Sequence, residues 1–219
     1  MSEFEITPKN RVKQGSDQAD YHKAQVYQIL DAGLVAQVAF SEDDQPFIVP
    51  MIYGREGNTL YLHGARKSRL VRLLARHPKV CVQVTLLDGI VVARSTFNSS
   101  MNYRSVTVFG VPQLIEDAQE KQKALKVISE QLLPGRWQEV RPSFDREVAM
   151  TGVLRLEIES GSAKISAGPP EDEDEDYSAE VWAGVLPLQL QAGALQPDPV
   201  LRAGIAPSQL MLDLQGKIY

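Results

Sequence analysis

The sequence has a single cysteine, no long apolar run and no apolar segment near its beginning. Because Cys81 has no second cysteine to pair with, an internal disulfide is excluded and a structural zinc site is not expected. No stretch approaches the roughly 20 apolar residues that a membrane-spanning helix needs, and Met1–Asp20 lacks the apolar core of a secretory signal. We therefore expect a cytoplasmic protein with no membrane partner and no metal site.

A recognisable nucleophile is also missing. Cys81 lies between Val80 and Val82, which is typical of a small residue in a strand, and no histidine or acidic partner is recognisable beside it. No catalytic residue is therefore assigned from the sequence.

The net charge of -5 comes from one short run. Glu171–Asp176 supplies six negative charges, and the rest of the chain has a net charge close to +1. Six consecutive carboxylates repel one another and are costly to desolvate, so we expect this run to be an exposed loop. The near balance elsewhere gives no reason to expect a nucleic-acid partner.

Hydrophobic periodicity predicts short strands interrupted by single helices. The predicted strands are residues 34–40, 46–53, 58–63, 80–93, 103–109 and 151–159. The fourth is either a hairpin that turns at Asp88-Gly89 or one long bent strand. A parallel sheet would need a helix after nearly every strand, so this order favours a small antiparallel barrel, mainly β with peripheral α-helices.

The predicted helices begin and end at recognisable signals. They run from Ser16 or Asp17 to Gly33, from Leu70 to His77-Pro78, and over residues 116–133. In the third helix we expect the leucines and isoleucine to point inward and the lysines outward.

The composition is that of one globular domain with additional segments at its ends. With 219 residues, 43% apolar and 23% charged, the chain can bury a substantial core. We expect a polar N-terminal arm over residues 1–14 and a barrel domain over residues 15–168. Residues 169–219 are predicted to form an acidic loop and a tail that packs on the barrel.

The segment His63–Arg69 (HGARKSR) lies between a predicted strand and a predicted helix. Gly64 lies at the junction and Ser68 supplies a hydroxyl. The segment also holds three cations, Arg66, Lys67 and Arg69. Free N–H groups and the macrodipole already make the start of a helix positive, so further cations there favour a bound phosphate. The alternative is a basic solvent-exposed face, which Arg72 and Arg76 would continue.

Several further motifs follow one another in a recognisable order. They are Pro46-x-x-x-Pro50, Leu60-Tyr-Leu-His-Gly64, the basic helix, Ser100-Met-Asn-Tyr-Arg-Ser-Val106, Val108-Phe-Gly110, Pro134-Gly-Arg-Trp137, Ala163-Lys-Ile-Ser-Ala-Gly-Pro-Pro170 and Val181-Trp-Ala-Gly-Val-Leu-Pro187. Together they resemble the pyridoxamine 5'-phosphate oxidase-like FMN-binding split-barrel proteins, and within them the flavin-nucleotide-binding branch. The resemblance covers residues 15–190.

This resemblance implies a six-stranded antiparallel split β-barrel that forms a homodimer, with FMN in two equivalent sites between the subunits. The family's phosphate-binding stretch matches the basic segment, which implies these cofactor residues: His63, Gly64, Ala65, Arg66, Lys67, Ser68 and Arg69. The backbone along the isoalloxazine ring would be that of Val49, Pro50, Met51 and Ile52. Pro50 lacks an N–H and interrupts the strand ladder, which suits contacts made by the main chain.

Three other positions are candidates for the same site. Gln83 and Thr85 alternate with apolar residues, so they face a cofactor, a partner subunit or solvent. Arg104 falls on an aliphatic face, where a guanidinium needs either a structural carboxylate partner or the flavin phosphate. His63 is either a structural hydrogen-bonding residue or a donor to flavin or substrate.

The resulting interpretation is an FMN-dependent oxidoreductase of unknown small-molecule substrate, in which the flavin carries the redox chemistry. True pyridoxamine phosphate oxidases end in an arginine-rich signature around a tryptophan, whereas Trp182 is followed by Ala-Gly-Val-Leu-Pro. Oxidation of pyridoxamine phosphate is therefore not expected. Two alternatives are a flavin-binding or flavin-sensing protein without turnover and a haem-binding barrel.

Overall fold

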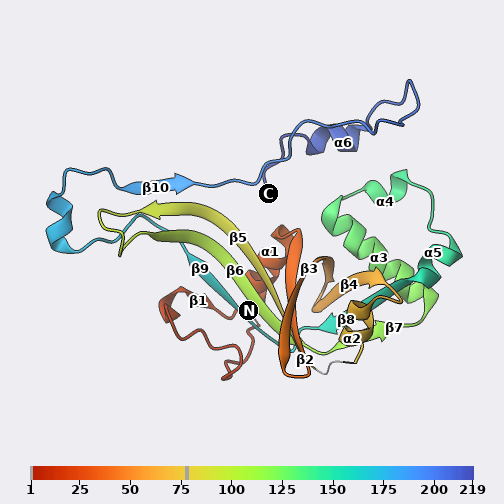
Figure 1. The fold of residues 1–219 in the computed structure, drawn as a ribbon, viewed down its shortest axis with the longest axis horizontal. Helices are drawn as coiled ribbons and strands as arrows, with labels where there is room; N and C mark the ends of the chain where they lie inside the picture. Colours follow the sequence, from red (N-terminus) through yellow and green to blue (C-terminus); the bar gives the residue numbers. More distant parts are fainter. Residues whose placement is uncertain (1, 77–78) are drawn as a thin grey trace. The chain divides into compact units, whose positions relative to one another are not determined.

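The computed structural model describes residues 2–76 and 79–219 and divides them into two compact units. The first unit comprises the chain up to Leu86 together with Tyr103–Ala167, and the second comprises Leu87–Asn102 together with Gly168–Tyr219. Figure 1 labels the strands and helices of both.

The sheet is mainly antiparallel. The strands outside the C-terminal segment are β1 (Ala19–Asp20), β2 (Val35–Glu42), β3 (Gln45–Glu56), β4 (Thr59–Ala65), β5 (Val80–Val92), β6 (Ser100–Gly110), β7 (Pro112–Ile115), β8 (Thr151–Glu157) and β9 (Ser160–Ser166). Strands β2, β3 and β4 form a meander, β8 pairs with β4, and β5 pairs with the other edge of β2. The order is β1-β9-β6-β5-β2-β3-β4-β8-β7. The predicted fold class, mainly antiparallel β with few helices, is confirmed.

The core of the first unit follows from strand alternation. In β2, Ala36, Val38 and Phe40 are buried, while Val35 and Gln37 are exposed on the opposite face. Neighbouring strands and helix α1 (Lys23–Ala32) complete the same core with Leu60, Leu62, Val82, Val84, Val106, Val108, Leu154, Leu156, Val26, Ile29 and Leu30.

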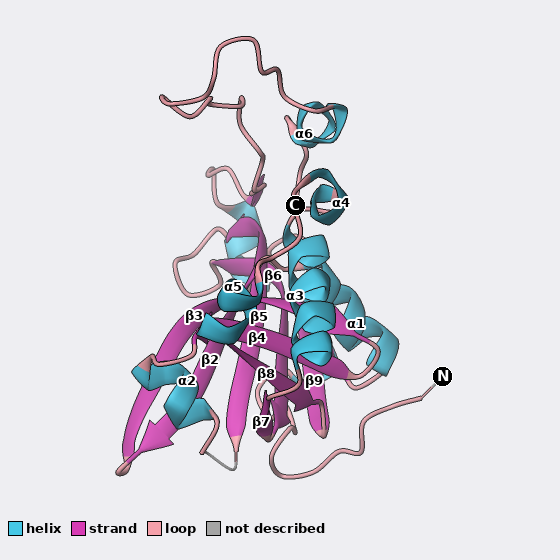
Figure 2. Ribbon diagram, turned by 90° about the vertical axis from the view of Figure 1, so that its right-hand side faces the viewer, coloured by secondary structure: helices cyan, strands magenta, loops and turns pink. Residues whose placement is uncertain are grey.

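Helix α3 (Ala118–Leu132) packs against β3, β4 and β8, and Figure 2 shows it running along the sheet. A second apolar cluster lies between this helix and the strands. It is made of Ala124 and Ile128 of α3 together with Tyr61, Ile115 and Val153. Gly54 permits this close packing, because a Cβ there would lie 2.7 Å from the backbone of Ile128. No helix among the described residues has the length and apolar character that crossing a membrane demands.

The second unit contains β10 (Gly184–Pro187), which pairs with the end of β5, and helix α6 (Gln209–Leu214). The backbone N–H and Nη1 of Arg94 donate to the two carboxylate oxygens of Asp172, at 2.8 and 3.0 Å. The Asp172 side chain is fully buried, so the prediction of an exposed acidic loop is wrong for this residue. The other carboxylates of the run are exposed or half-buried, and Asp174–Ser178 form a short 3-10 helix.

The N-terminal part differs from prediction in two ways. Helix α1 begins at Lys23, because Gly15 adopts a φ of 60° and the chain then pairs Ala19–Asp20 with β9 before the helix starts. Within the predicted polar arm, Phe4 is buried in the core and the Asn10 amide donates to the carbonyl of Gly161 at 3.0 Å.

Other boundaries depend on tertiary contacts. Residues 80–92 form one long strand, which was one of the two alternatives. Helix α2 (Arg69–Leu74) was predicted to end at His77-Pro78, which lie outside the described residues. Sequence analysis missed β1, β7, β9 and β10 and the short helices α4 (Arg136–Glu139), α5 (Asp145–Met150) and α6. Strands β1, β7 and β10 and helix α4 contain at most four residues each, too few for a period to be recognised.

Candidate functional site

The outward face of strands β3, β2 and β5 brings together several predicted residues of the first unit. Gln37 of β2 lies opposite Pro50 of β3 on one side and Gln83 of β5 on the other. All three side chains are exposed, and so is Thr85, two residues beyond Gln83. We call the surface around Gln37 the open sheet face. Sequence analysis missed Gln37, because the register that aligns it with Pro50 and Gln83 is set by strand pairing.

The four predicted residues of β3 do not share one face. Pro50 is exposed on the open sheet face, whereas Met51 is buried and Val49 packs against the core. Ile52 is half-buried against the cluster under α3. Strand alternation enforces this division, so contact of the flavin with the backbone of this segment stays a prediction.

The basic segment forms the predicted strand-to-helix junction. Strand β4 ends at Ala65, and the Ser68 N–H donates to the Ala65 carbonyl at 2.8 Å in a tight turn. The Ser68 Oγ caps α2 by accepting from the N–H of Val71 at 3.2 Å. Gly64 faces this helix, because a Cβ there would lie 3.1 Å from the Val71 side chain.

The cations of the segment differ in their contacts. Arg66 Nη2 donates to Glu116 at 2.6 Å, and Arg69 pairs with Glu42 and lies over the ring of Phe47. Lys67 is exposed and makes no hydrogen bond or ion pair with any residue that the structure describes. Exposed ion pairs contribute only about 0–1 kcal/mol, so both arginines can exchange their carboxylates for a ligand at small cost. The basic solvent face stays an alternative.

His63 has an unsatisfied ring nitrogen. It lies on β4 opposite Val153, and its Nδ1 is buried without a hydrogen bond to any described residue. Burial lowers the pKa of His63, which favours the neutral ring with one donor and one acceptor nitrogen.

Arg104 and Cys81 follow strand alternation. Arg104 is half-buried on the face of β6 that also carries the buried Val106 and Val108, as predicted. Cys81 is half-buried, and burial raises the pKa of its thiol, which disfavours the reactive thiolate.

A pocket of about 230 Å³ adjoins Arg66 and was not predicted. We call it the Lys121 pocket, and its lining residues are Arg66, Glu116, Ala118, Lys121, Gln122, Asp145, Val148 and Ala149. Lys121 is only 2% exposed, so the prediction that the lysines of this helix point outward is wrong here. Its position three and four residues before Ala124 and Leu125 places it on the buried stripe, which is the signal that could have identified it. Burial lowers the pKa of Lys121, and Arg66 lowers it further against the opposing effect of Glu116.

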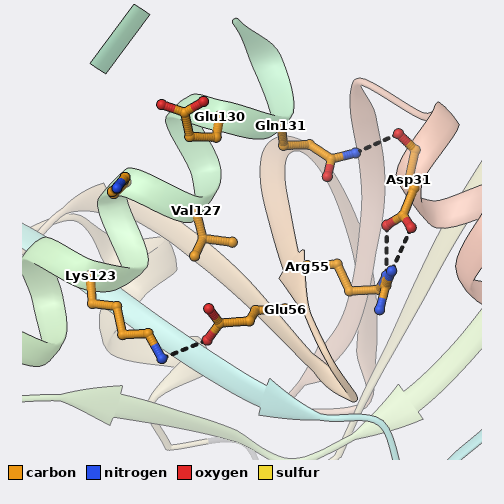
Figure 3. Close-up of a pocket in the computed structure, with 8 residues that line it drawn as sticks. Asp31, Arg55, Glu56, Lys123, Val127, Glu130 and Gln131 are labelled. Carbon is orange, nitrogen blue, oxygen red and sulfur yellow. Dashed lines mark hydrogen bonds and ion pairs between the residues drawn. The ribbon is translucent and has the colours of Figure 1, made fainter. Parts of the chain in front are cut away.

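A larger pocket of about 520 Å³ lies among α1, β3 and α3 and is drawn in Figure 3. Its side chains bind one another: Arg55 pairs with both carboxylate oxygens of Asp31, and Lys123 pairs with Glu56 at 2.7 Å. The Gln131 amide donates to three carbonyls at the end of α1. These contacts join α3 to α1 and β3, so they serve the fold.

Comparison with known proteins supports the sequence resemblance. The family described as pyridoxamine 5'-phosphate oxidase matches residues 22–165. An uncharacterised protein of Rhizobium meliloti is 32% identical over 82 residues, which span 37% of this chain and 47% of that relative, about half its length.

Two solved structures resemble almost the whole chain. A flavocytochrome of Azotobacter vinelandii shares 35% identity at a TM-score of 0.89, covering 96% of this chain and 98% of that one. An FAD- and haem-binding protein of Mycobacterium smegmatis shares 38% identity at a TM-score of 0.87, covering 91% of this chain and 98% of that one. The fold, the order of motifs and these matches agree, and the chain belongs to the pyridoxamine 5'-phosphate oxidase-like split-barrel family.

Proposed function

We propose that this protein is a flavin-dependent oxidoreductase that binds FMN and acts on a small molecule. The observation that carries the proposal is the likeness, over nearly the whole chain, to a flavocytochrome and to a protein that binds FAD and haem. A bound flavin supplies hydride and electron transfer, so no side chain needs to be assigned as a catalytic residue.

The residues present fit a flavin phosphate at the basic segment. Lys67 has no partner among the described residues, and Arg66 and Arg69 are held only by exposed ion pairs. The buried Nδ1 of His63, at the same end of β4, has no hydrogen-bond partner among the described residues. The phosphate would be bound by Arg66, Lys67, Ser68 and Arg69, with Arg104 as a further candidate.

The open sheet face supports a homodimer with the flavin between subunits. Apolar side chains lie beside Gln37 on this face: Ile48 is 67% exposed and Val35 is 44% exposed. Burial of apolar surface against a second copy would stabilise the dimer by about 25 cal/mol for each Å² removed from water. The isoalloxazine ring would lie along Val49–Ile52, near Gln83 and Thr85. A cytoplasmic location also stays part of the proposal.

Haem is a second candidate cofactor, because the descriptions of both similar structures name a cytochrome or haem. It would accompany the flavin or take its place.

The absorption spectrum of the purified protein tests these proposals. We expect flavin bands, with FMN released by denaturation and identified by chromatography, whereas a Soret band would identify haem. Reduced nicotinamide nucleotide should then bleach the flavin bands if the protein turns over, and a flavin-sensing protein would keep its colour. A protein that purifies without flavin and takes up none on titration would contradict the proposal.

A further inference from the structure

Lys121 is a buried charge that lacks a partner of its own. The residue is only 2% exposed, and its ammonium group makes no hydrogen bond or ion pair with any of the described residues. Isolation of a charge from water is costly unless an opposite charge or hydrogen-bond acceptors replace the solvent. An anion in the Lys121 pocket would supply both.

Arg66 brings further donors to the same pocket. Its Nη2 is occupied by Glu116, whereas its Nε and Nη1 make no hydrogen bond within the described part of the chain. Together, the ammonium and these N–H groups provide several charge-assisted donors, the arrangement that recognises phosphate. Ala118, Val148 and Ala149 supply an apolar lining beside these donors, and Val148 is buried.

The size of the pocket limits the ligand. Its volume of about 230 Å³ is below the roughly 300–1,000 Å³ of pockets that enclose a whole small molecule. It therefore suits one group of a larger ligand or a free ion.

We propose that the Lys121 pocket binds a phosphate group through Lys121 and Arg66. Arg66 adjoins Lys67 in the chain, so one residue connects this pocket to the flavin phosphate site proposed above. The favoured source is accordingly the second phosphate of a dinucleotide flavin, so in this form the inference rests on the proposed flavin site but requires FAD in place of the FMN proposed above. A separate phosphate-bearing ligand is the other source of the same chemistry.

Two carboxylates also line the pocket, and one of them predicts whether a control substitution strengthens or weakens phosphate binding. Glu116 is engaged by Arg66, whereas Asp145 is exposed and would repel a phosphate. Replacement Asp145→Asn should therefore strengthen phosphate binding, because it removes a like charge without changing the shape of the side chain. An amine-bearing ligand would respond in the opposite direction.

The test compares FAD, FMN and inorganic phosphate on three forms of the full-length protein: wild type, Lys121→Met and Lys126→Met. The methionine keeps the apolar stem of the buried lysine and removes its charge. Lys126 is exposed on the same helix outside this pocket, so its replacement controls for the loss of one positive charge. We expect Lys121→Met to weaken FAD binding by about ten-fold or more, with FMN affinity within two-fold and no change for Lys126→Met.

Each remaining outcome decides one part of the inference. If Lys121→Met affects FAD and FMN equally little but abolishes calorimetric binding of inorganic phosphate, the pocket is supported and its source is a separate ligand. Unchanged binding of all three compounds overturns the inference, as does weaker phosphate binding by the folded Asp145→Asn protein. If wild type binds no flavin, the proposed function fails, and the phosphate titration alone decides the pocket.

Discussion

The two units of the chain bury their side chains in different ways. In the first unit, many leucines and valines of the core are fully buried on alternating strand positions. In the second unit, the buried apolar side chains among the described residues are Val91 and Ala93, while Trp182 and Leu186 are more than half exposed. An ion pair between the partly exposed Arg94 and the buried carboxylate of Asp172, together with the β5–β10 pairing, holds the second unit instead.

This difference teaches where each type of stabilisation acts. Full burial of one leucine contributes about 1.5–3 kcal/mol and needs no specific partner, only close-packed apolar neighbours. A buried carboxylate is stable only with its cation in place. The first unit should therefore depend on volume and the second on particular pairs.

Removal of core volume should produce the largest effect. Leu154→Ala should lower the free energy of unfolding by about 2–5 kcal/mol, because it leaves a cavity among fully buried neighbours. Leu186→Ala in β10 should change it by less than about 0.5 kcal/mol, because that side chain is exposed. Urea denaturation measures the free energy of unfolding of both variants. Equal losses of stability would contradict the proposed difference between the units.

Loss of the buried ion pair should come next. Asp172→Ala removes two hydrogen bonds to Arg94 and should lower the local stability of the second unit by roughly 1.5–3 kcal/mol. Hydrogen exchange of the amides in residues 87–102 should accelerate, with little change in the first unit. Asp174→Ala, at an exposed position of the same acidic run, is the matched control and should have no effect.

The phosphate assignment predicts a smaller effect, confined to the first unit. Lys67→Ala and Arg66→Ala should each weaken FMN binding by about ten-fold, and the double variant should be weaker still, because charge-assisted hydrogen bonds are lost. Riboflavin, which lacks the phosphate, should be affected much less. Flavin fluorescence titration gives the affinities, and circular dichroism confirms that the variants fold.

The acidic run of the second unit supplies the control for this experiment. Glu173→Gln should leave FMN affinity within two-fold, because the phosphate assignment gives this exposed carboxylate no contact with the ligand and salt screens exposed charges. Equal losses for FMN and riboflavin in the Lys67 and Arg66 variants would contradict the assignment and make Arg104 the next candidate.

The smallest effect should come from His63. Its pKa lies below the ordinary 6.5 in the folded protein, so below about pH 6.5 the unfolded chain binds more protons than the folded one. The stability of the wild-type protein should therefore fall as the pH drops through this range. The stability of the His63→Gln variant should fall less steeply. Thermal unfolding of both proteins from pH 7.5 to pH 5.5 measures the difference, and parallel curves would exclude this role.

Much of the first unit could be predicted because its strands alternate. The β2–β3–β4 meander and the junction at Gly64 follow from apolar positions spaced by two and from a glycine before a helical period. Strand β9 was missed because Ser160–Ser166 is composed mostly of small residues, and pairing with β6 determines its conformation. Gln37 was missed as a site residue because its two cross-strand neighbours are distant in sequence.

By itself, the sequence determined the antiparallel β class, the basic segment and the family, because alternation, local charge and motif order all act over short separations. Only the tertiary structure decided that Lys121 lies inside and that Asp172 is buried. Side-chain chemistry predicts exposure for both residues, and each prediction fails for the same physical reason. Burial of a charge depends on helix packing or on a partner far along the chain: the helical spacing places Lys121 on the packed stripe, but only the folded chain brings Arg94 to Asp172.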